Sequence, residues 1–352
     1  MGWFGRDIPG GKDLIAVHAT GYDYTRTGKP DIVWDDSEAK GSLVSALVAD
    51  ALALLAAVDP DALDAKAADA YALLALVAGQ DVEPADGSDG TDGRWQIARK
   101  VAPDRVISTV DPDARHAHKT REDRRDGYKA HIVIEPDTGL VTAAVITKAA
   151  GKGASDAEAG AMLLGQDRTI ATEIQVLADS AYGTGELLRD LATAGHTALI
   201  KPKPLARAIE GGFTIDDFAY DQLAGTLRCP NGLLRAITAK GRATFGAGCT
   251  GCPIRSRCTA AAQGRKVHLH PEHALMREHR AAARKDSFQA DYTRHRPMVE
   301  RSIAWLVKDN RRLRYRGTTK NHAWWQLRTA AVNLKRLLKL GLTIENGSWA
   351  TA

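Results

Sequence analysis

The chain has 352 residues, of which 44% are hydrophobic and 26% charged, and its formal net charge is +5. This length is enough for two or three domains, and the composition excludes a disordered or fibrous protein. Four cysteines are too few to stabilise a secreted scaffold of this size. We find no signal peptide, and the longest apolar stretch, residues 43–58, carries Asp50 and is shorter than a membrane span. We therefore expect a cytoplasmic protein with no membrane partner.

Charge is distributed unevenly along the chain. Residues 1–90 are acidic, whereas the C-terminal part, from about residue 293, is strongly basic. A basic end of this kind favours an anionic partner, most plausibly nucleic acid. The alternative is a basic surface that is simply solvated.

Two helices are expected near the N-terminus, within a helical region at 1–82. The first covers residues 37–58, with Ser37 as its N-cap, and the second covers residues 62–77 and ends at Gly79. The short connection between them predicts a helical hairpin. Residues 83–94 repeat Asp-Gly units and are interpreted as an acidic linker rather than a calcium loop, because the spacing does not match one.

Residues 95–204 predict the first part of an α/β core. Strands are expected at 105–110, 127–134, 140–146, 174–178 and 198–200, and helices at 155–164 and 184–194. Three hairpin strands followed by alternating units indicate a mixed sheet with helices on its faces. Asp179 follows a buried strand, at the sheet edge where ligand and metal chemistry collects. The alternative role of Asp179 is a helix N-cap.

All four cysteines lie in an inserted segment, residues 205–290. Cys249 and Cys252 form a CxxC motif, Cys258 follows shortly after, and Cys229 lies in a knuckle-like Cys-Pro-Asn-Gly turn. Tetrahedral zinc prefers four such ligands brought together by tight turns, so the spacing predicts a structural zinc site. The alternatives are reduced thiols without a metal and, less compatible with the cytoplasm, a disulfide.

Residues 291–342 predict two helices that complete the core. Pro297 is placed in the first turn of the helix at 292–308, so Glu300 is expected in that first turn as well. The alternative role of Glu300 is a negative charge that stabilises the N-terminus of the helix. The last helix, 322–340, is expected to bury five residues on one face: Trp324, Leu327, Ala331, Leu334 and Leu338.

Carboxylates from separate elements suggest a metal site. Asp179 and Glu300 could bind Mg²⁺, and a pair of ions held with a third carboxylate could clamp a phosphodiester. Asp111, which follows the expected strand 105–110, is the candidate for the third. Basic side chains near Glu300 would hold the phosphate backbone: Arg294, Arg296, Arg301, Lys308, Arg311, Arg312, Arg314 and Arg316.

Several stretches, in this order, resemble DDE transposases of bacterial insertion sequences. Residues 176–183, Val-Leu-Ala-Asp-Ser-Ala-Tyr-Gly, are similar to the second-aspartate motif, and residues 296–308 with 311–316 are similar to the glutamate motif. The hairpin 127–139, the Asp-Pro-Asp-Ala-Arg stretch at 111–115 with Lys119 and Thr120, and the four-cysteine insertion match one group of these elements. The resemblance covers residues 95–340.

The resemblance implies a ribonuclease-H-like fold with an insertion between Asp179 and Glu300. It also implies cleavage and strand transfer on double-stranded DNA, at element ends and target, with two Mg²⁺ ions and a homo-dimer on the DNA. The family's first catalytic Asp has no convincing copy here, because Asp89-Gly-Thr91 lies in the polar linker. The resemblance thus suggests a truncated, inactive copy whose first Asp lay upstream of Met1.

A second departure is the spacing of Tyr292, Arg296, Glu300 and Lys308, which differs from the family pattern by about one residue. Two other functions stay open. One is a non-catalytic DNA-binding protein derived from a transposase, and the other is a ribonuclease-H-like nuclease that cuts without joining.

Overall fold

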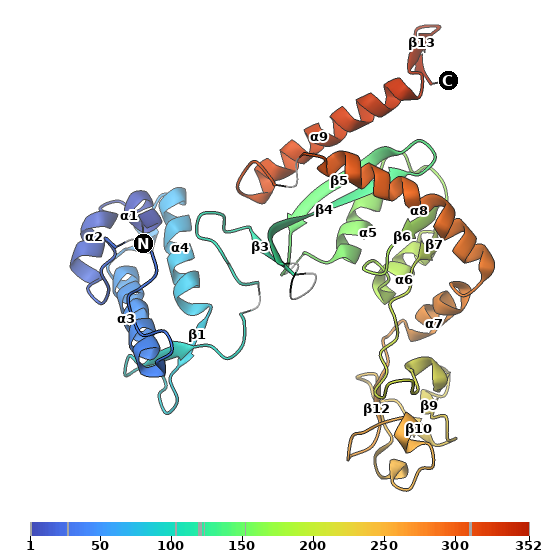
Figure 1. Cartoon of the computed structure of the whole chain (residues 1–352), viewed down its shortest axis with the longest axis horizontal. Coiled ribbons are helices and arrows are strands. Elements are labelled where there is room, and N and C mark those ends of the chain that lie inside the picture. Colours follow the sequence, from blue (N-terminus) through green and yellow to red (C-terminus); the bar gives the residue numbers. More distant parts are fainter. Residues whose placement is uncertain are drawn as a thin grey trace. The chain divides into compact units, whose positions relative to one another are not determined.

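The computed structural model describes residues 2–26, 28–102, 104–118, 122, 124–151, 153–309 and 312–351 (Figure 1). The chain divides into two compact units. Unit 1 comprises Met1–Lys129, Lys148–Lys152 and Arg314–Asn321, and unit 2 comprises Ala130–Thr147, Gly153–Leu313 and His322–Ala352. The mixed α/β character predicted from the sequence is confirmed.

Unit 1 begins with four helices, α1 (Gly2–Asp7), α2 (Gly11–His18), α3 (Ser37–Ala56) and α4 (Ala65–Gly79). The predicted helical hairpin is α3 and α4, joined through a 3-10 turn at Pro60–Ala62. The N-cap of α3 is Asp36 and not Ser37, because the Asp36 carboxylate accepts the backbone N–H of Glu38 at 2.8 Å. Asp64 caps α4 in the same way through Ala67.

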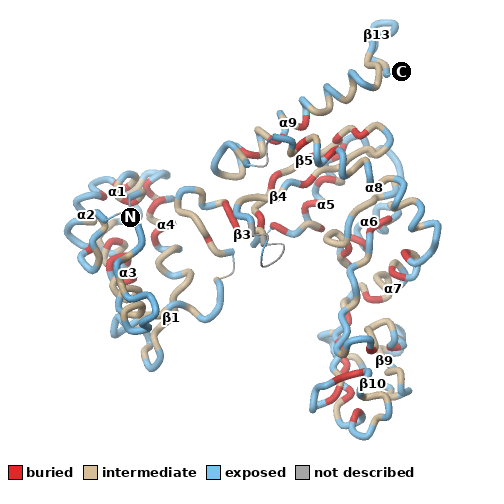
Figure 2. The backbone as a smooth tube through the Cα atoms, viewed as in Figure 1, coloured by how far each residue is buried: buried red, intermediate tan, exposed pale blue. Residues whose placement is uncertain are grey.

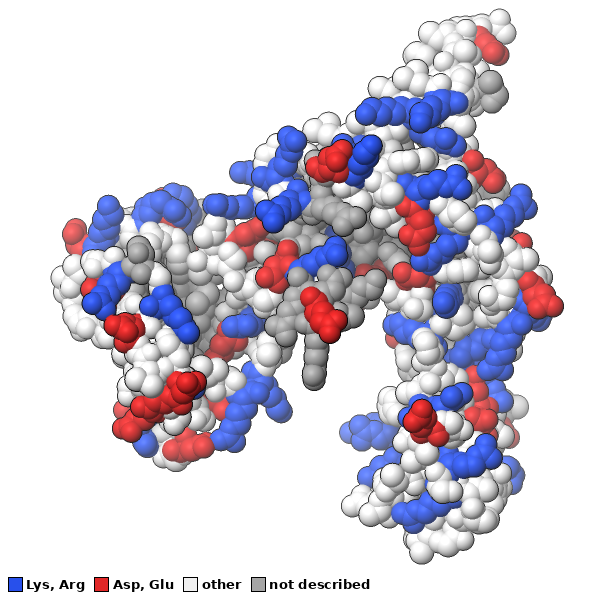
Figure 3. Space-filling model, viewed as in Figure 1, with Lys and Arg blue, Asp and Glu red and all other residues white. Residues whose placement is uncertain are grey.

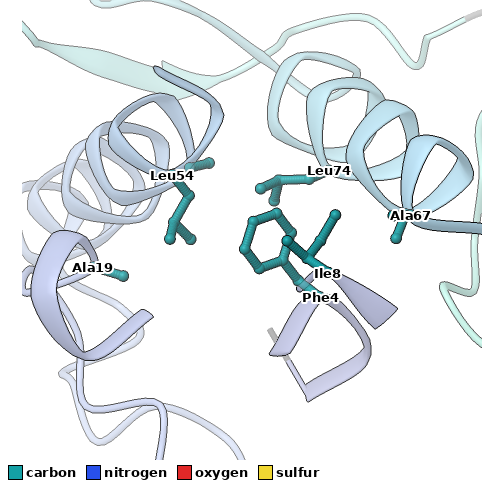
Figure 4. Close-up of a cluster of buried hydrophobic side chains, with 8 residues drawn as sticks. Phe4, Ile8, Ala19, Leu54, Ala67 and Leu74 are labelled. Carbon is teal, nitrogen blue, oxygen red and sulfur yellow. The ribbon is translucent and has the colours of Figure 1, made fainter. Parts of the chain in front are cut away.

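The helices of unit 1 pack around one apolar core (Figure 4). Phe4 and Leu54 are fully buried in it, and Ile8 and Leu74 lie beside them. Asp50 is also buried, and its carboxylate accepts from the Tyr24 hydroxyl at 2.9 Å and the Gly21 N–H at 2.8 Å. By length and composition α3 is the one described helix that could cross a membrane, but its contacts with α2 and α4 and its satisfied buried carboxylate are typical of a core helix.

Residues 82–97 include the segment interpreted as a linker, and here they form a hairpin. Strands β1 (Val82–Pro84) and β2 (Trp95–Ile97) pair antiparallel, and β2 also packs against α3. The strand predicted at 105–110 is wrong, because those residues form no strand. The backbone of Val106 bonds instead to the Gln80 side-chain amide, at 2.8 Å and 2.9 Å.

An antiparallel sheet of order β3-β4-β5 follows. It consists of β3 (Arg115–His118), β4 (Arg124–Glu135) and β5 (Leu140–Lys148). The predicted hairpin at 127–146 is confirmed as β4 and β5, with a turn that accepts positive φ at Gly139. Within unit 1, β3 pairs with the first half of β4, from Arg115↔Gly127 to His118↔Arg124.

The next part of unit 2 alternates helix and strand. Helix α5 (Asp156–Gln166) precedes β6 (Gln175–Ala178), α6 (Gly185–Thr193) and β7 (Thr197–Ile200), and β6 pairs parallel with β7. Leu187, Leu188, Leu191 and Ile200 form the buried cluster between them. The described strands form separate small sheets rather than the single mixed sheet expected from the sequence, and the predicted first strand is not among them.

The cysteine-rich segment is built from very short elements. It contains β8 (Ala219–Asp221), β9 (Thr226–Arg228) and β10 (Leu234–Ala236) in one antiparallel sheet, and β11 (Arg242–Thr244) paired with β12 (Lys266–His268). Phe218, Leu227 and Phe245 are fully buried in its small core. Helix α7 (His273–Ala282) follows and packs against α6.

The chain ends with α8 (Asp286–Val307), α9 (Thr318–Lys339) and a small hairpin of β13 (Thr343–Glu345) and β14 (Ser348–Ala350). Pro297 lies inside α8 and not in its first turn, which corrects the expected start of this helix. Its inner face carries the buried Ser302 and Leu306.

The face of α9 expected to be buried is wrong. Leu327, Leu334 and Leu338 are 73%, 55% and 63% exposed, whereas Trp325 is 4% exposed. Figure 2 shows α9 mostly in the colours of exposed and intermediate residues. The reason is that α9 lies along the free edge of β5, whose unpaired backbone groups need polar partners. Asn333 bonds both the N–H and the carbonyl of Val141, at 2.9 and 2.7 Å, and Gln326 donates to the Ala144 carbonyl at 2.6 Å.

Candidate functional site

Asp179 lies where the sequence predicted, directly after β6. It is exposed, and its Oδ1 accepts the backbone N–H of Ala181 at 2.8 Å. It does not cap the following helix, because the N-cap of α6 is Thr184, whose hydroxyl accepts from Leu187. The alternative role of Asp179 as a helix N-cap is therefore wrong, and the carboxylate lies at a turn on the carboxyl end of a parallel strand.

Tyr182 anchors that turn to the β4–β5 sheet. Its hydroxyl lies 3.1 Å from Nδ1 of the buried His131, whose Nε2 lies 3.1 Å from the Thr147 hydroxyl. Burial raises the pKa of Tyr182 to about 12, and the charges of Asp156 and Asp179 add to this. A Cβ on Gly160 of α5 would come within 2.9 Å of the Tyr182 ring, so glycine is needed there for the ring to pack.

Glu300 lies in the middle of α8, and its placement in the first helical turn is wrong. Its Oε1 accepts from the Arg296 guanidinium at 2.7 and 3.0 Å, and Arg296 also donates to the Tyr292 hydroxyl at 2.5 Å. Tyr292, Arg296 and Glu300 thus form a hydrogen-bonded row at four-residue spacing on one side of the helix. Glu300 faces solvent with a 57% exposed side chain, opposite the buried Ser302.

The fold brings the elements of these two carboxylates together, since α8 packs against β6 and β7. Both are oxygen donors of the kind that Mg²⁺ prefers. Within the part of the chain that the structure describes, however, no group of three or more His, Cys, Asp or Glu side chains could hold a metal ion. The two carboxylates therefore fit the chemistry of a divalent cation, but they do not complete a site.

Asp111, the candidate for the third carboxylate, belongs to unit 1. Its Oδ1 accepts from the Tyr128 hydroxyl at 2.6 Å and from the Gly317 N–H at 3.1 Å. Burial raises the pKa of Tyr128, and hydrogen bonding to Asp111 adds to the effect. Asp113 likewise accepts the N–H and the hydroxyl of Thr318, each at 2.8 Å. Both aspartates hold the start of α9, so the contacts of Asp111 are those of a structural residue.

The predicted phosphate-binding residues have different surroundings. Arg294, Arg301, Arg312, Arg314 and Arg316 are exposed, and Lys308 is exposed at the C-cap of α8. Arg296 is half-buried and paired with Glu300. Arg311, together with Lys119 and Thr120, lies outside the described residues. Figure 3 shows Lys and Arg side chains spread over the visible face, with Asp and Glu side chains among them.

The four cysteines converge. All are free thiols, and all four line one small cavity of about 20 Å³. Backbone turns shape it, with the Gly232 N–H donating to the Cys229 carbonyl at 2.8 Å and the Arg265 N–H donating to Cys249 Sγ at 3.4 Å. Burial raises the pKa of Cys258, and the other three thiols contribute in the same direction. This donor set suits zinc chemically, although the thiols are not gathered tightly enough to form a preassembled site.

Two buried groups were missed by the sequence reasoning. His131 has a sequence signal, since it is a histidine inside an alternating apolar strand. The second is the pair of Arg280 and Asp216, whose atoms lie 2.5 Å apart with side chains only 10% and 14% exposed. Nothing in the sequence pairs residues that lie so far apart along the chain. This ion pair fixes α7 to the cysteine-rich segment.

Comparisons with known proteins give one match. Residues 235–338 match a protein-family model described as a transposase DDE domain. This stretch includes Glu300 and three of the four cysteines, while Asp179 lies before it. None of the curated proteins and none of the solved structures compared with the chain matches it. The match supports a DDE transposase domain over this stretch of the chain.

Proposed function

We propose that the protein is a transposase that acts on the ends of an insertion sequence, cleaving DNA and transferring strands with Mg²⁺. The observation that carries the proposal is the transposase match over the helix of Glu300, combined with the packing of that helix against the strand that delivers Asp179. A ribonuclease-H-like arrangement is part of the proposal. It is supported by the strand-helix order from β4 to β7.

In this proposal Asp179 and Glu300 hold Mg²⁺, which would supply charge stabilisation at the phosphodiester. Glu300 must exchange its contact with Arg296 for the metal, and Arg296 is then available to a phosphate oxygen. A third carboxylate is required, and Asp111 is already engaged by Tyr128 and Gly317. A second copy of the chain on the DNA remains an expectation of the resemblance.

The test uses substitutions that keep hydrogen bonds and remove charge. Asp179→Asn retains an acceptor for the Ala181 N–H, and Glu300→Gln retains one for Arg296. Asp190→Asn and Glu278→Gln are matched controls on α6 and α7. With Mg²⁺ and duplex DNA carrying element ends, the first pair should abolish strand transfer and leave DNA binding intact, and the controls should stay active. If the unsubstituted protein cleaves no DNA with Mg²⁺ or Mn²⁺, the catalytic proposal is rejected.

One observation favours the second candidate function, a non-catalytic DNA-binding protein. The described residues gather no third metal ligand, whereas exposed basic residues are plentiful. Binding without cleavage in the same assay would select this function. Cleavage without joined product would select the nuclease.

We also propose that Cys229, Cys249, Cys252 and Cys258 hold one structural Zn²⁺. The support is that four free thiols, a ligand set typical of structural zinc, line a single small cavity. Elemental analysis of protein purified without chelators should find about one zinc per chain. Cys252→Ser should lower that content, whereas Ser256→Ala should not. Metal-free protein with an unchanged fold would reject the proposal.

A further inference from the structure

The cysteine-rich segment has an extreme charge composition. Residues 222–270 contain eight Lys and Arg residues and no Asp or Glu. Four acidic residues of the wider segment precede them, at Glu210, Asp216, Asp217 and Asp221, and three follow them, at Glu272, Glu278 and Asp286. In Figure 3 the lower part of the body that carries β9 and β10 shows basic side chains, and its carboxylates lie toward the upper part.

These eight cations fall into three groups. Arg255 and Arg265 have a structural role, because Arg255 donates to the carbonyls of Cys249 and Ala261 and Arg265 donates to that of Cys258. Arg235 is half-buried and donates to the Leu234 carbonyl. The other five are exposed: Arg228, Lys240, Arg242, Arg257 and Lys266. Every residue from 222 to 270 is described, and within this stretch none of the eight forms a salt bridge with a carboxylate. Among the described residues, no salt bridge therefore neutralises their charge.

The β11–β12 ribbon orders part of this charge on one face. Ala243 and Val267 lie opposite each other and are buried, so the flanking residues of both strands point outward. Arg242 lies across from His268, and Thr244 lies across from Lys266. All four are exposed. The outward face is thus basic and polar, while the inward face closes the core beside Phe245.

A tight turn adds Lys240 to this face. The Gly241 N–H donates to the Thr238 carbonyl at 2.8 Å, and the Arg242 N–H donates to the Thr238 hydroxyl at 3.1 Å. Gly241 has φ of +70°, and a Cβ there would lie 2.5 Å from the Leu269 carbonyl oxygen. The backbone at this turn therefore requires glycine, which fixes Lys240 next to Arg242 at the end of the ribbon.

We infer that this surface, Lys240, Arg242 and Lys266 with Thr244 and His268, contacts the phosphate backbone of duplex DNA. The inference rests on the proposed function for the identity of the partner, and it adds a second contact surface to the basic helices α8 and α9. The three cations have no carboxylate partner within the ribbon, and a polyanion would supply the missing negative charge. A two-stranded ribbon is also narrow enough to lie in a major groove.

The test measures binding without chemistry. A short labelled DNA duplex is titrated with the protein over a series of salt concentrations. The buffer contains no Mg²⁺, no Mn²⁺ and no metal chelator. The triple variant Lys240→Gln, Arg242→Gln, Lys266→Gln is compared with Lys12→Gln, Arg26→Gln, Lys66→Gln, which removes equal charge from exposed positions of unit 1. The charge-retaining variant Lys240→Arg, Arg242→Lys, Lys266→Arg completes the set, and thermal melting checks the fold of each.

The ribbon variant should bind roughly tenfold more weakly, and its log–log salt slope should fall by about 2 to 3, because each lost phosphate contact removes about 0.9. The unit 1 control and the charge-retaining variant should bind as the unsubstituted protein does. An unchanged salt slope in the ribbon variant, an equal loss in the unit 1 control, or tighter binding of single-stranded RNA than of duplex DNA would overturn the inference.

The two proposals can fail separately. If Asp179→Asn leaves strand transfer unchanged while the ribbon variant loses binding, the catalytic proposal is wrong and the ribbon contact stands. If strand transfer needs Asp179 while the ribbon variant binds DNA normally, the catalytic proposal stands and the ribbon contact is wrong.

Discussion

The helical region of unit 1 and the cysteine-rich segment of unit 2 are stabilised by different means. Helices α1 to α4 share a core in which Phe4 and Leu54 are completely buried, and α3 alone is 20 residues long. In the cysteine-rich segment each strand from β8 to β12 has 3 residues. Long helices bury continuous apolar stripes, whereas each of these short strands buries at most one side chain.

This difference in core size indicates which region needs a covalent or metal crosslink. Small bodies with little core depend on disulfides or metals, and larger helical bodies do not. The chain keeps its four cysteines in the segment with the shorter elements. Surface charge separates the two regions as well, since the first ninety residues are acidic and the ribbon segment is basic.

The largest effect is expected from removing the thiol cluster. Cys249→Ser, at a buried position, should unfold residues 205–270 and leave α1 to α4 folded, with a loss of several kcal/mol in that segment. Limited proteolysis with mass spectrometry locates the cuts. Ser256→Ala is the matched control, and a segment that stays protected in Cys249→Ser and in chelator would show that its apolar core suffices.

The converse test acts on unit 1. Leu54→Ala removes a fully buried side chain and should lower the free energy of unfolding of α1 to α4 by about 2–5 kcal/mol. Leu52→Ala on the same helix, where the side chain is 51% exposed, should change it by less than about 0.5 kcal/mol. Amide hydrogen exchange measures the local stability of both units in one experiment. Loss of protection in the cysteine-rich segment of Leu54→Ala would contradict the independence of the two regions.

The ion pair between Asp216 and Arg280 should matter next. Asp216→Ala leaves Arg280 buried without its partner and should cost roughly 3 kcal/mol in the docking of α7. The exposed pair Arg189–Asp190 is the comparison, and Asp190→Ala should cost no more than about 1 kcal/mol. Thermal melting of both variants measures the two losses of stability. Equal melting temperatures would show that the buried pair contributes nothing specific.

Acidification should have the smallest effect, and it should act on α7 alone. Burial lowers the pKa of His273 and of His279, and His279 also contacts the Ile200 carbonyl at 2.7 Å. Because these pKa values are lower in the folded state, the unfolded chain binds more protons below its ordinary histidine pKa. Stability is full above about pH 6.5 and declines below it, by at most about 1.4 kcal/mol per pH unit for each histidine.

Hydrogen exchange of α7 between neutral and mildly acidic pH measures that decline, with α3 as the internal reference. His273→Phe should reduce it, because the His273 ring packs against Tyr220 and its Nε2 has no partner. A decline of equal size in α3 would point to general acid destabilisation instead.

Local patterns gave a good forecast of the elements that the site needs. The strands expected at 127–134 and 140–146 correspond to β4 and β5, and the buried strand expected before Asp179 corresponds to β6. The strand expected at 105–110 failed because a side chain, Gln80, satisfies the Val106 backbone that a neighbouring strand would have paired. Sequence cannot show which partner a backbone group finds.

The helices of the candidate site were less predictable. The sequence places Pro297 in the first turn of a helix at 292–308, whereas α8 extends back to Asp286, and Phe288 and Tyr292 stack four residues apart along it. For α9 the sequence predicted the helix correctly but assigned the wrong face of it to the core. The structural role of Asp111 was equally hard to predict. It depends on contacts with Tyr128 and Gly317, which are distant in the sequence.

The contact of α9 with β5 also governs how the protein can be cut into fragments. Asn333, Gln326 and His322 cover backbone groups of β5 that would otherwise be free to pair with a strand of another molecule. A fragment that ends before His322 would uncover that strand and should aggregate, although it would lose three exposed leucines at the same time. We therefore expect the solubility of this protein to depend on a helix that covers a strand edge with polar side chains and leaves Leu327, Leu334 and Leu338 exposed.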